Sequence, residues 1–264
     1  MNDSLIKAYT LMALGQYTNA IKYFKSYMNE EPNIPLSKEA FKLLSKAYNK
    51  LTNYNRNYIR ELEAYLESLR DSDQERIVAI TSLLDETRKD LIVICTEVVN
   101  IINNNLLKNV VEIREKVLIY NMKGDYCRYI WEVNNSDEIC KEATKAYNEA
   151  MGICQWNFKS TDPYLLQVTL NFTTHLNNTN NTERATVILK RVIQNLQTED
   201  VQHYDLLKKS YIDLVLKYLK ENLVRFQNII NQKNIQIIQL IEEFEINDYL
   251  HEELLDNLIT RKQG

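Results

Sequence analysis

Apolar side chains recur at intervals of three and four residues along most of the chain. The clearest case is residues 37–69, where the recurring positions are Phe41, Leu44, Ala47, Tyr48, Leu51, Tyr54, Tyr58, Leu62 and Tyr65. This period is that of an amphipathic helix, and Ser37 stands where an N-cap is expected. The same period predicts helices at about 3–15, 18–30, 74–104, 110–133, 137–157, 163–177, 183–198 and 203–229. We therefore expect nine helices.

Residues that form turns are scarce. The 264 residues include only four glycines and three prolines, too few for the many turns of a sheet protein. After Phe226 the composition changes, first to Ile, Asn and Gln and then to acidic residues. The sequence thus predicts an all-α protein, with a helical domain at 1–227 and an extension at 228–264 of one or two further helices.

Charge and hydropathy limit the partners and the location. The net charge of −4 argues against nucleic acid as the main partner, because affinity for the phosphate backbone needs a basic face. No run approaches the ~18 to 20 apolar residues that cross a bilayer. The polar start, MNDSLIKAYT, lacks the apolar centre of a signal peptide. We expect a cytoplasmic protein that is not bound to membranes.

The usual signatures of catalysis and of metal binding are missing from the sequence. Cys95, Cys127, Cys140 and Cys154 form no C-x-x-C pair, which predicts reduced and mostly buried thiols. His175, His203 and His251 are far apart and fit no metal-ligand spacing, and no glycine-rich phosphate loop exists. The sequence therefore predicts no enzyme activity, no cofactor and no metal.

The segment VLIYNMKGDYCRYIWEV, residues 117–133, carries the most informative charges. On a helix, Asp125, Arg128 and Glu132 share one face and Tyr129 lies beside them. For an arbitrary helix this is an intrahelical ladder of ion pairs on a solvated face. The helix at 37–69, however, carries a second stripe with Asn49, Arg56 and Arg60. Two guanidinium groups and a phenol from two helices would form a receptor for a phosphate dianion.

Five segments also carry a family resemblance: LLSKAYNK, YNRNYIR, MKGDYCRY, DPYLLQVTLNFT and KYLKENL. In this order, over about residues 1–227, they resemble the 14-3-3 family. The resemblance implies nine antiparallel helices around a concave groove, and an adaptor that binds client proteins phosphorylated on serine or threonine. It implies that Arg56, Arg128 and Tyr129 hold the phosphate. The peptide-binding positions that it implies are Arg60, Lys123, Asp125, Leu170, Asn171, Thr174, Val215, Tyr218, Asn222 and Phe226.

Some positions depart from the family pattern. Asn49 and Asn121 stand where the family has lysines, Phe226 stands where it has tryptophan, and Asn178 stands where it has glutamate. At least one positive charge is therefore missing from the expected phosphate pocket. We expect a weaker or altered ligand preference.

The resemblance also implies a homodimer, but its ion pairs are absent. Gln16, Asn19, Glu86 and Asp90 occupy the positions at which the family pairs opposite charges. Exposed ion pairs contribute only ~0 to 1 kcal/mol each, so apolar contacts from Leu11, Leu14 and Leu83 could still hold a dimer. We expect a homodimer that is weaker than usual for the family.

Two other classes of protein are alternatives to this adaptor. The stretch ALGQYTNAIKYF followed by Pro32 fits a tetratricopeptide-like scaffold that binds unphosphorylated peptides, but such a solenoid needs about three repeats and one clear copy is present. A hydrolase is disfavoured because no spacing places a paired acid and base.

The extension has three interpretations. It carries seven acidic residues and no Lys or Arg between Glu242 and Asp256, alongside an apolar stripe that favours docking over free disorder. It could extend the helical bundle, occupy the groove in place of a phosphate and so regulate it, or contact another molecule.

Overall fold

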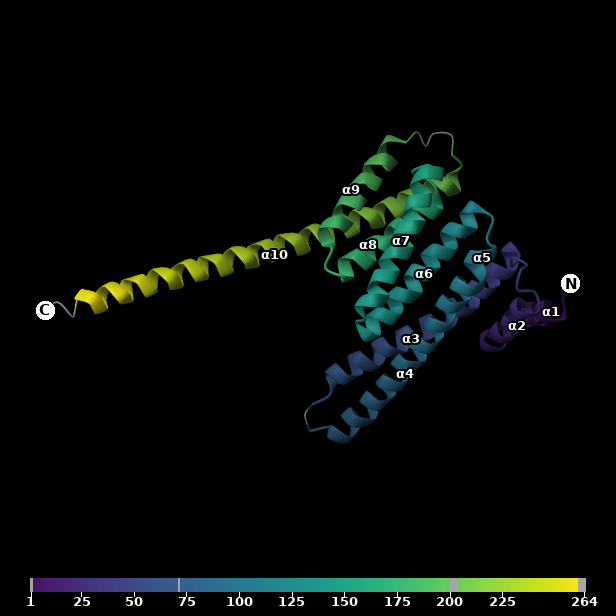
Figure 1. Cartoon of the computed structure of the whole chain (residues 1–264), viewed down its shortest axis with the longest axis horizontal. Coiled ribbons are helices and arrows are strands. Elements are labelled where there is room, and N and C mark those ends of the chain that lie inside the picture. The colour runs from purple at the N-terminus through teal and green to yellow at the C-terminus, as the bar shows by residue number, and fades with distance from the viewer. Residues whose placement is uncertain (1, 71, 200–203, 261–264) are drawn as a thin grey trace. The chain divides into compact units, whose positions relative to one another are not determined.

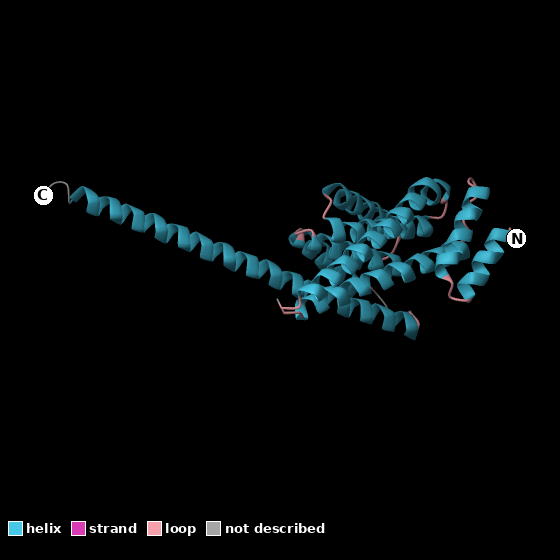
Figure 2. Ribbon diagram, turned by 90° about the horizontal axis from the view of Figure 1, so that it is seen from below, coloured by secondary structure: helices cyan, strands magenta, loops and turns pink. Residues whose placement is uncertain are grey.

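The computed structural model describes residues 2–70, 72–199 and 204–260, and their side chains as far as residue 236. Over these residues the chain consists of helices and connecting loops, as Figure 2 shows by its colours. The α-helices are α1 (Asp3–Ala13), α2 (Tyr17–Glu30), α3 (Lys38–Ser68), α4 (Gln74–Ile101), α5 (Leu107–Asn109), α6 (Ile113–Asn134), α7 (Asp137–Asn157), α8 (Pro163–Asn178), α9 (Thr182–Thr198) and α10 (Leu206–Thr260), labelled in Figure 1. The expected all-α class is confirmed.

The chain divides into two compact units, residues 1–175 and residues 176–264. In the first unit α3 packs against α4, α4 against α6, and α6 against α7. In the second unit α9 packs against α10. The expected boundary at 227/228 stays a prediction.

Local sequence explains where several helices begin and end. The Ser37 hydroxyl accepts a hydrogen bond from the backbone N–H of Ala40 at 3.2 Å, which confirms the expected N-cap of α3. Pro163 is the first residue of α8, where its missing N–H costs nothing. Gly15 links α1 to α2 with φ +71°, in the left-handed region that favours glycine. These signals set the hairpins that bring distant helices together.

The apolar stripe predicted on α3 is buried only in part. Leu44 and Tyr48 are almost fully buried, as the period predicts. Tyr54 and Tyr65, in contrast, are 70% and 47% exposed, and the Tyr54 ring stacks against the Tyr58 ring. The second half of α3 therefore presents aromatic surface to solvent, which period alone does not distinguish from core.

The helix that begins at Gln74 continues to Asn109 as α4, a π-helical stretch at Ile102–Leu106, and α5. Its sequence there is INNNL, and three consecutive asparagines are poor helix formers. One 18-residue window of this rod has a mean hydropathy of 1.3, so by length and composition it could cross a membrane. A buried core helix passes the same test, and 33% of the window is buried, so this is weak evidence.

Helix α10 differs from the expectation of separate terminal helices. It runs without interruption from Leu206 to Thr260, so the residues after Asn228 continue the same helix. The sequence between 228 and 236, rich in Asn and Gln but free of Gly and Pro, contains no strong helix breaker.

The four cysteines are free, as predicted. Cys95, Cys127 and Cys154 are buried, and burial raises the pKa of each of these thiols to about 12. Such thiols stay protonated and unreactive at neutral pH.

Candidate functional site

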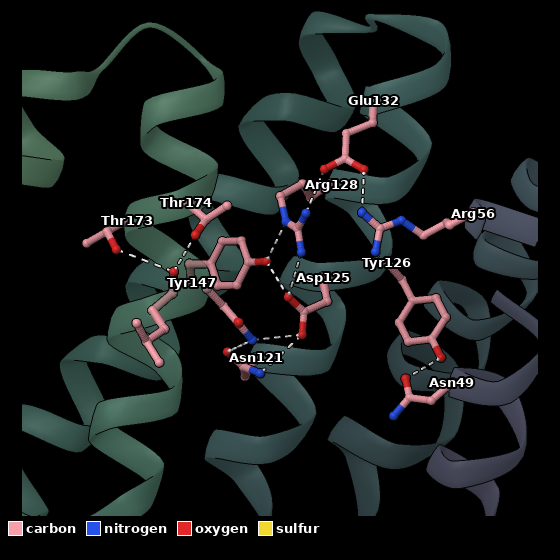
Figure 3. A network of polar contacts seen from close by, with 12 residues as sticks. Asn49, Arg56, Asn121, Asp125, Tyr126, Arg128, Glu132, Tyr147, Thr173 and Thr174 are labelled. Carbon is pink, nitrogen blue, oxygen red and sulfur yellow. Dashed lines mark hydrogen bonds and ion pairs between the residues drawn. The ribbon is translucent and has the colours of Figure 1, made fainter. Parts of the chain in front are cut away.

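Charged and polar side chains from four helices of the first unit meet in one cluster (Figure 3). Helix α6 supplies most of them, because residues 121, 125, 128, 129 and 132 recur at helical spacing. Helix α3 adds Asn49 and Arg56, α7 adds Tyr147, and α8 adds Asn171. The expectation that arginines of two different helices come together is met.

The two arginines share one carboxylate. Arg56 Nη2 donates to Glu132 Oε2 at 3.0 Å, and Arg128 Nη1 donates to Glu132 Oε1 at 2.6 Å. Arg128 is buried, whereas the side chain of Arg56 remains 18% exposed. Glu132 therefore holds two guanidinium groups next to each other although their charges repel.

The ring of Tyr129 lies under both guanidinium groups. The Arg56 guanidinium carbon is 3.9 Å from the ring centre and that of Arg128 is 4.7 Å from it. Cation–π attraction thus helps to hold both groups at this ring. Burial raises the pKa of the Tyr129 phenol, with the charge of Asp125 acting in the same direction, so the hydroxyl stays neutral and able to donate.

Asp125, whose side chain is 17% exposed, is the anchor of the cluster. Its carboxylate accepts from Tyr147 Oη at 2.6 Å, from Asn171 Nδ2 at 3.1 Å, from Asn121 Nδ2 at 3.3 Å and from Arg128 Nη2 at 3.4 Å. Burial raises the pKa of Asp125, while the charge of Arg128 and the hydrogen bond from Tyr147 act against this rise. With four donors, the carboxylate can orient Arg128 as expected.

Tyr147 can reach this position because residue 124 is glycine. A Cβ at Gly124 would lie 2.7 to 2.8 Å from three atoms of the Tyr147 ring, closer than real Cβ atoms approach. The ring is fully buried, and its hydroxyl also accepts from Arg128 Nε at 3.3 Å. The adjacent Gly124 and Asp125 of MKGDYCRY are therefore linked through Tyr147. Gly124 leaves room for the Tyr147 ring, and the Tyr147 hydroxyl donates a hydrogen bond to Asp125.

Asn49 lies at the edge of the cluster. Its Oδ1 accepts a hydrogen bond from Tyr126 Oη at 3.1 Å, which turns the amide nitrogen the other way. Burial raises the pKa of Tyr126 well above its usual value, so this hydroxyl remains a donor. Asn49 thus offers a neutral amide N–H where a lysine would offer a charge.

Not every predicted residue of the first unit joins the cluster. Lys123 donates to Asn103 Oδ1 and pairs with Glu142, both at 2.8 Å, because it lies about 200° around α6 from Asp125. Its assignment to the peptide site does not fit these contacts.

Arg60 is exposed one turn beyond Arg56, with Nη1 3.4 Å from Asn57 Oδ1. On α8, half-buried Leu170, Asn171 and Thr174 lie on one face, and Asn171 reaches Asp125.

The predicted groove residues of α10 belong to the second unit. Tyr218 is 50% exposed and Asn222 is half-buried, as a binding face requires. Val215 and Phe226 are buried, 5% and 0% exposed, and their place in a groove wall stays a prediction. The outward apolar position is Leu214, one turn before Tyr218 and 50% exposed.

Two supporting contacts could not be found from spacing alone. Tyr147 lies on another helix, 22 residues after Asp125, and no local pattern points to their contact. The sequence placed Glu132 on the face of Arg128 but gave no sign that it also binds Arg56, 76 residues earlier.

Comparison with known proteins decides the family. A sequence model described as "14-3-3 protein" matches residues 7–227. The chain belongs to the 14-3-3 family. The 14-3-3 protein eta of Homo sapiens is 28% identical to it over 201 residues, which are 73% of this chain and 81% of that protein. The eta proteins of Bos taurus and Mus musculus have the same identity and coverage.

Membership in this family removes the basis for the tetratricopeptide alternative, because the single repeat-like stretch around Gly15 lies inside the matched range. Among the residues that the structure describes, no three His, Cys, Asp or Glu side chains gather as a metal site would require.

Proposed function

We propose that this 14-3-3 protein is an adaptor that binds client proteins phosphorylated on serine or threonine. One observation carries the proposal: the guanidinium groups of Arg56 and Arg128 converge, stacked on Tyr129 and held by a single carboxylate. A phosphate presents three acceptor oxygens and nearly two negative charges, which suit such a pair.

The two arginines have different roles in this proposal. Each guanidinium has five N–H donors. Nε, Nη1 and Nη2 of Arg128 all contact protein acceptors, so this side chain is fixed. Arg56 makes one hydrogen bond with a described residue, to Glu132, and is the more exposed of the two. Arg56 is therefore the main donor to the phosphate, and Arg128 supplies fixed charge beside it.

The residues proposed to bind the peptide around the phosphate lie on α8 in the first unit and on α10 in the second. Leu170, Asn171 and Thr174 offer an apolar contact and two polar groups on α8. Tyr218 and Asn222 offer the same combination on α10, and Leu214 extends its apolar part.

We also propose a cytoplasmic homodimer without catalytic activity. Leu14 and Leu83, expected as apolar dimer contacts, are 68% and 43% exposed and so are available to a partner. Gln16 is exposed and uncharged, and Glu86 accepts a hydrogen bond from Ser82 of its own helix at 3.4 Å. These features favour a dimer held by apolar burial.

Binding of a phosphoserine peptide and of the same peptide without phosphate tests the proposal. The wild-type protein should bind the phosphoserine peptide much more tightly than the unphosphorylated peptide. Arg56→Ala and Arg128→Lys should each weaken binding about 10-fold or more, because a hydrogen bond to a charged group contributes ~1.5 to 3 kcal/mol. Lysine cannot replace the planar fork of Arg128. The matched control is Arg76→Ala, an exposed position on α4.

The readout is fluorescence anisotropy of the labelled peptides, with a melting curve for every variant. If both variants stay folded and bind the phosphopeptide within about twofold of wild type, where one lost charged hydrogen bond should cost far more, the site assignment is wrong.

A further inference from the structure

Glu132 takes the position between the arginines that a ligand anion would need. Each of its carboxylate oxygens is bound by a different arginine, at 3.0 Å from Arg56 and 2.6 Å from Arg128. Arg128 does not depend on this contact for its orientation, because Tyr147 and Asp125 bind its other nitrogens. The contact with Glu132 is thus not needed to orient Arg128, although it is what holds Arg56 beside Arg128.

The charges of the cluster cancel. Arg56 and Arg128 carry two positive charges, and Asp125 and Glu132 carry two negative ones. The nearby Asn49 contributes no charge. An approaching anion therefore meets no net positive charge from these side chains while Glu132 stays in place.

An incoming carboxylate has little to gain under these conditions. Glu132 already provides a carboxylate to both arginines, and as part of the same chain it acts at a high effective concentration. A glutamate or aspartate of a peptide would replace it with the same chemistry and would pay the entropy of association. A phosphate dianion brings a second charge and a third acceptor oxygen, so it gains in the exchange.

We propose that Glu132 is the specificity-determining residue that excludes carboxylate side chains from the arginine pair and leaves it to phosphate. This inference rests on the proposed function and explains how the pair Arg56 and Arg128 discriminates between phosphate and carboxylate ligands. It also opposes occupation of the site by the acidic stretch of the chain's own extension, since that stretch offers only carboxylates.

The test uses three peptides that differ at one position, which is serine, glutamate or phosphoserine. Their affinities are measured for the full chain as wild type, Glu132→Gln and Glu132→Ala. Wild type should bind the glutamate peptide within about twofold of the serine peptide. Both variants should bind the glutamate peptide at least about 10-fold better than the serine peptide, the equivalent of one hydrogen bond to a charged group.

The matched control is Glu149→Gln, which removes the same charge from an exposed position on α7 and should behave as wild type. The inference is overturned if both Glu132 variants bind phosphoserine peptide and still do not distinguish glutamate from serine. It is also overturned if they gain equally for serine and glutamate, or if Glu149→Gln gains as much. Should wild type fail to prefer phosphoserine over serine, the proposed function itself fails, and this outcome is read from wild type alone.

Discussion

Replacing Gly124 by alanine tests how the cluster is supported. In most helices this change is favourable by about 1 kcal/mol, because alanine has the higher helix propensity. Here the new Cβ would lie 2.7 Å from the Tyr147 ring, which is buried and cannot turn away into solvent. The ring or helix α7 must therefore shift.

The magnitudes favour a net loss of stability. Overpacking of a dense core costs about 1 to 3 kcal/mol. Displacing the ring also weakens the hydrogen bonds of its hydroxyl to Asp125 and Arg128, each contributing about 1.5 to 3 kcal/mol when intact. Partial loss of these bonds together with overpacking exceeds the gain in propensity. We expect Gly124→Ala to lower the free energy of unfolding by about 2 kcal/mol and to weaken phosphopeptide binding severalfold.

The chain provides its own control in Gly152 on α7. A Cβ there would meet nothing within 4 Å, so Gly152→Ala should stabilise by up to about 1 kcal/mol. Urea unfolding of both variants measures the contrast. In a Tyr147→Phe background, where the hydroxyl is already gone, Gly124→Ala should cost less than in wild type. A Gly124→Ala protein as stable as the Gly152→Ala protein would refute the reasoning.

Three further predictions concern acid, assembly and the extension. Burial, with a smaller effect of Arg128, lowers the pKa of His175 from 6.5 to about 4. Between these pH values His175 is therefore protonated in the unfolded chain and neutral in the folded one. As the pH is lowered from 6.5 to about 4, the free energy of unfolding should fall by up to about 3 kcal/mol. In urea unfolding at several pH values, His175→Gln should remove this part of the pH dependence. Leu14→Asp should dissociate the dimer in sedimentation, whereas added salt should not, since apolar contacts are not screened. Removing residues 229–264 should leave phosphopeptide affinity within about twofold, because the acidic stretch offers carboxylates and Glu132 already supplies a carboxylate to both arginines; a clear gain in affinity would mean that the extension covers the groove.

Most of the fold follows from apolar period and from the scarcity of turn residues. Period three and four predicted the helices of the first unit to within a few residues, since each must bury one face. Period could not tell a core face from an exposed one, which is why Tyr54 and Tyr65 were placed on the buried stripe. It also could not show that α10 would continue to Thr260, because composition changes at 228 without any helix-breaking residue.

The site was predictable where its geometry is local. The face shared by Asp125, Arg128 and Glu132 follows from helical spacing, and these contacts are present in the structure. Contacts between helices were not encoded in this way. The place of Tyr147 in the cluster is explained by the structure, in which its ring packs against Gly124. Lys123 pairs with Glu142 and not with the cluster, because neighbouring residues on a helix point in different directions.

The alternation of charge in the cluster stabilises the two neighbouring arginines. Positive and negative side chains alternate in the order Arg56, Glu132, Arg128, Asp125. Each guanidinium group therefore contacts at least one carboxylate, which offsets the repulsion between the two arginines. The same alternation lowers the attraction for a ligand, because part of the positive charge is already compensated. The stability of the cluster and its affinity for anions should therefore change in opposite directions. Glu132→Gln is expected to lower the melting temperature while it strengthens binding of anionic peptides, and a variant that gained both would show that the carboxylate does not support the arginine pair.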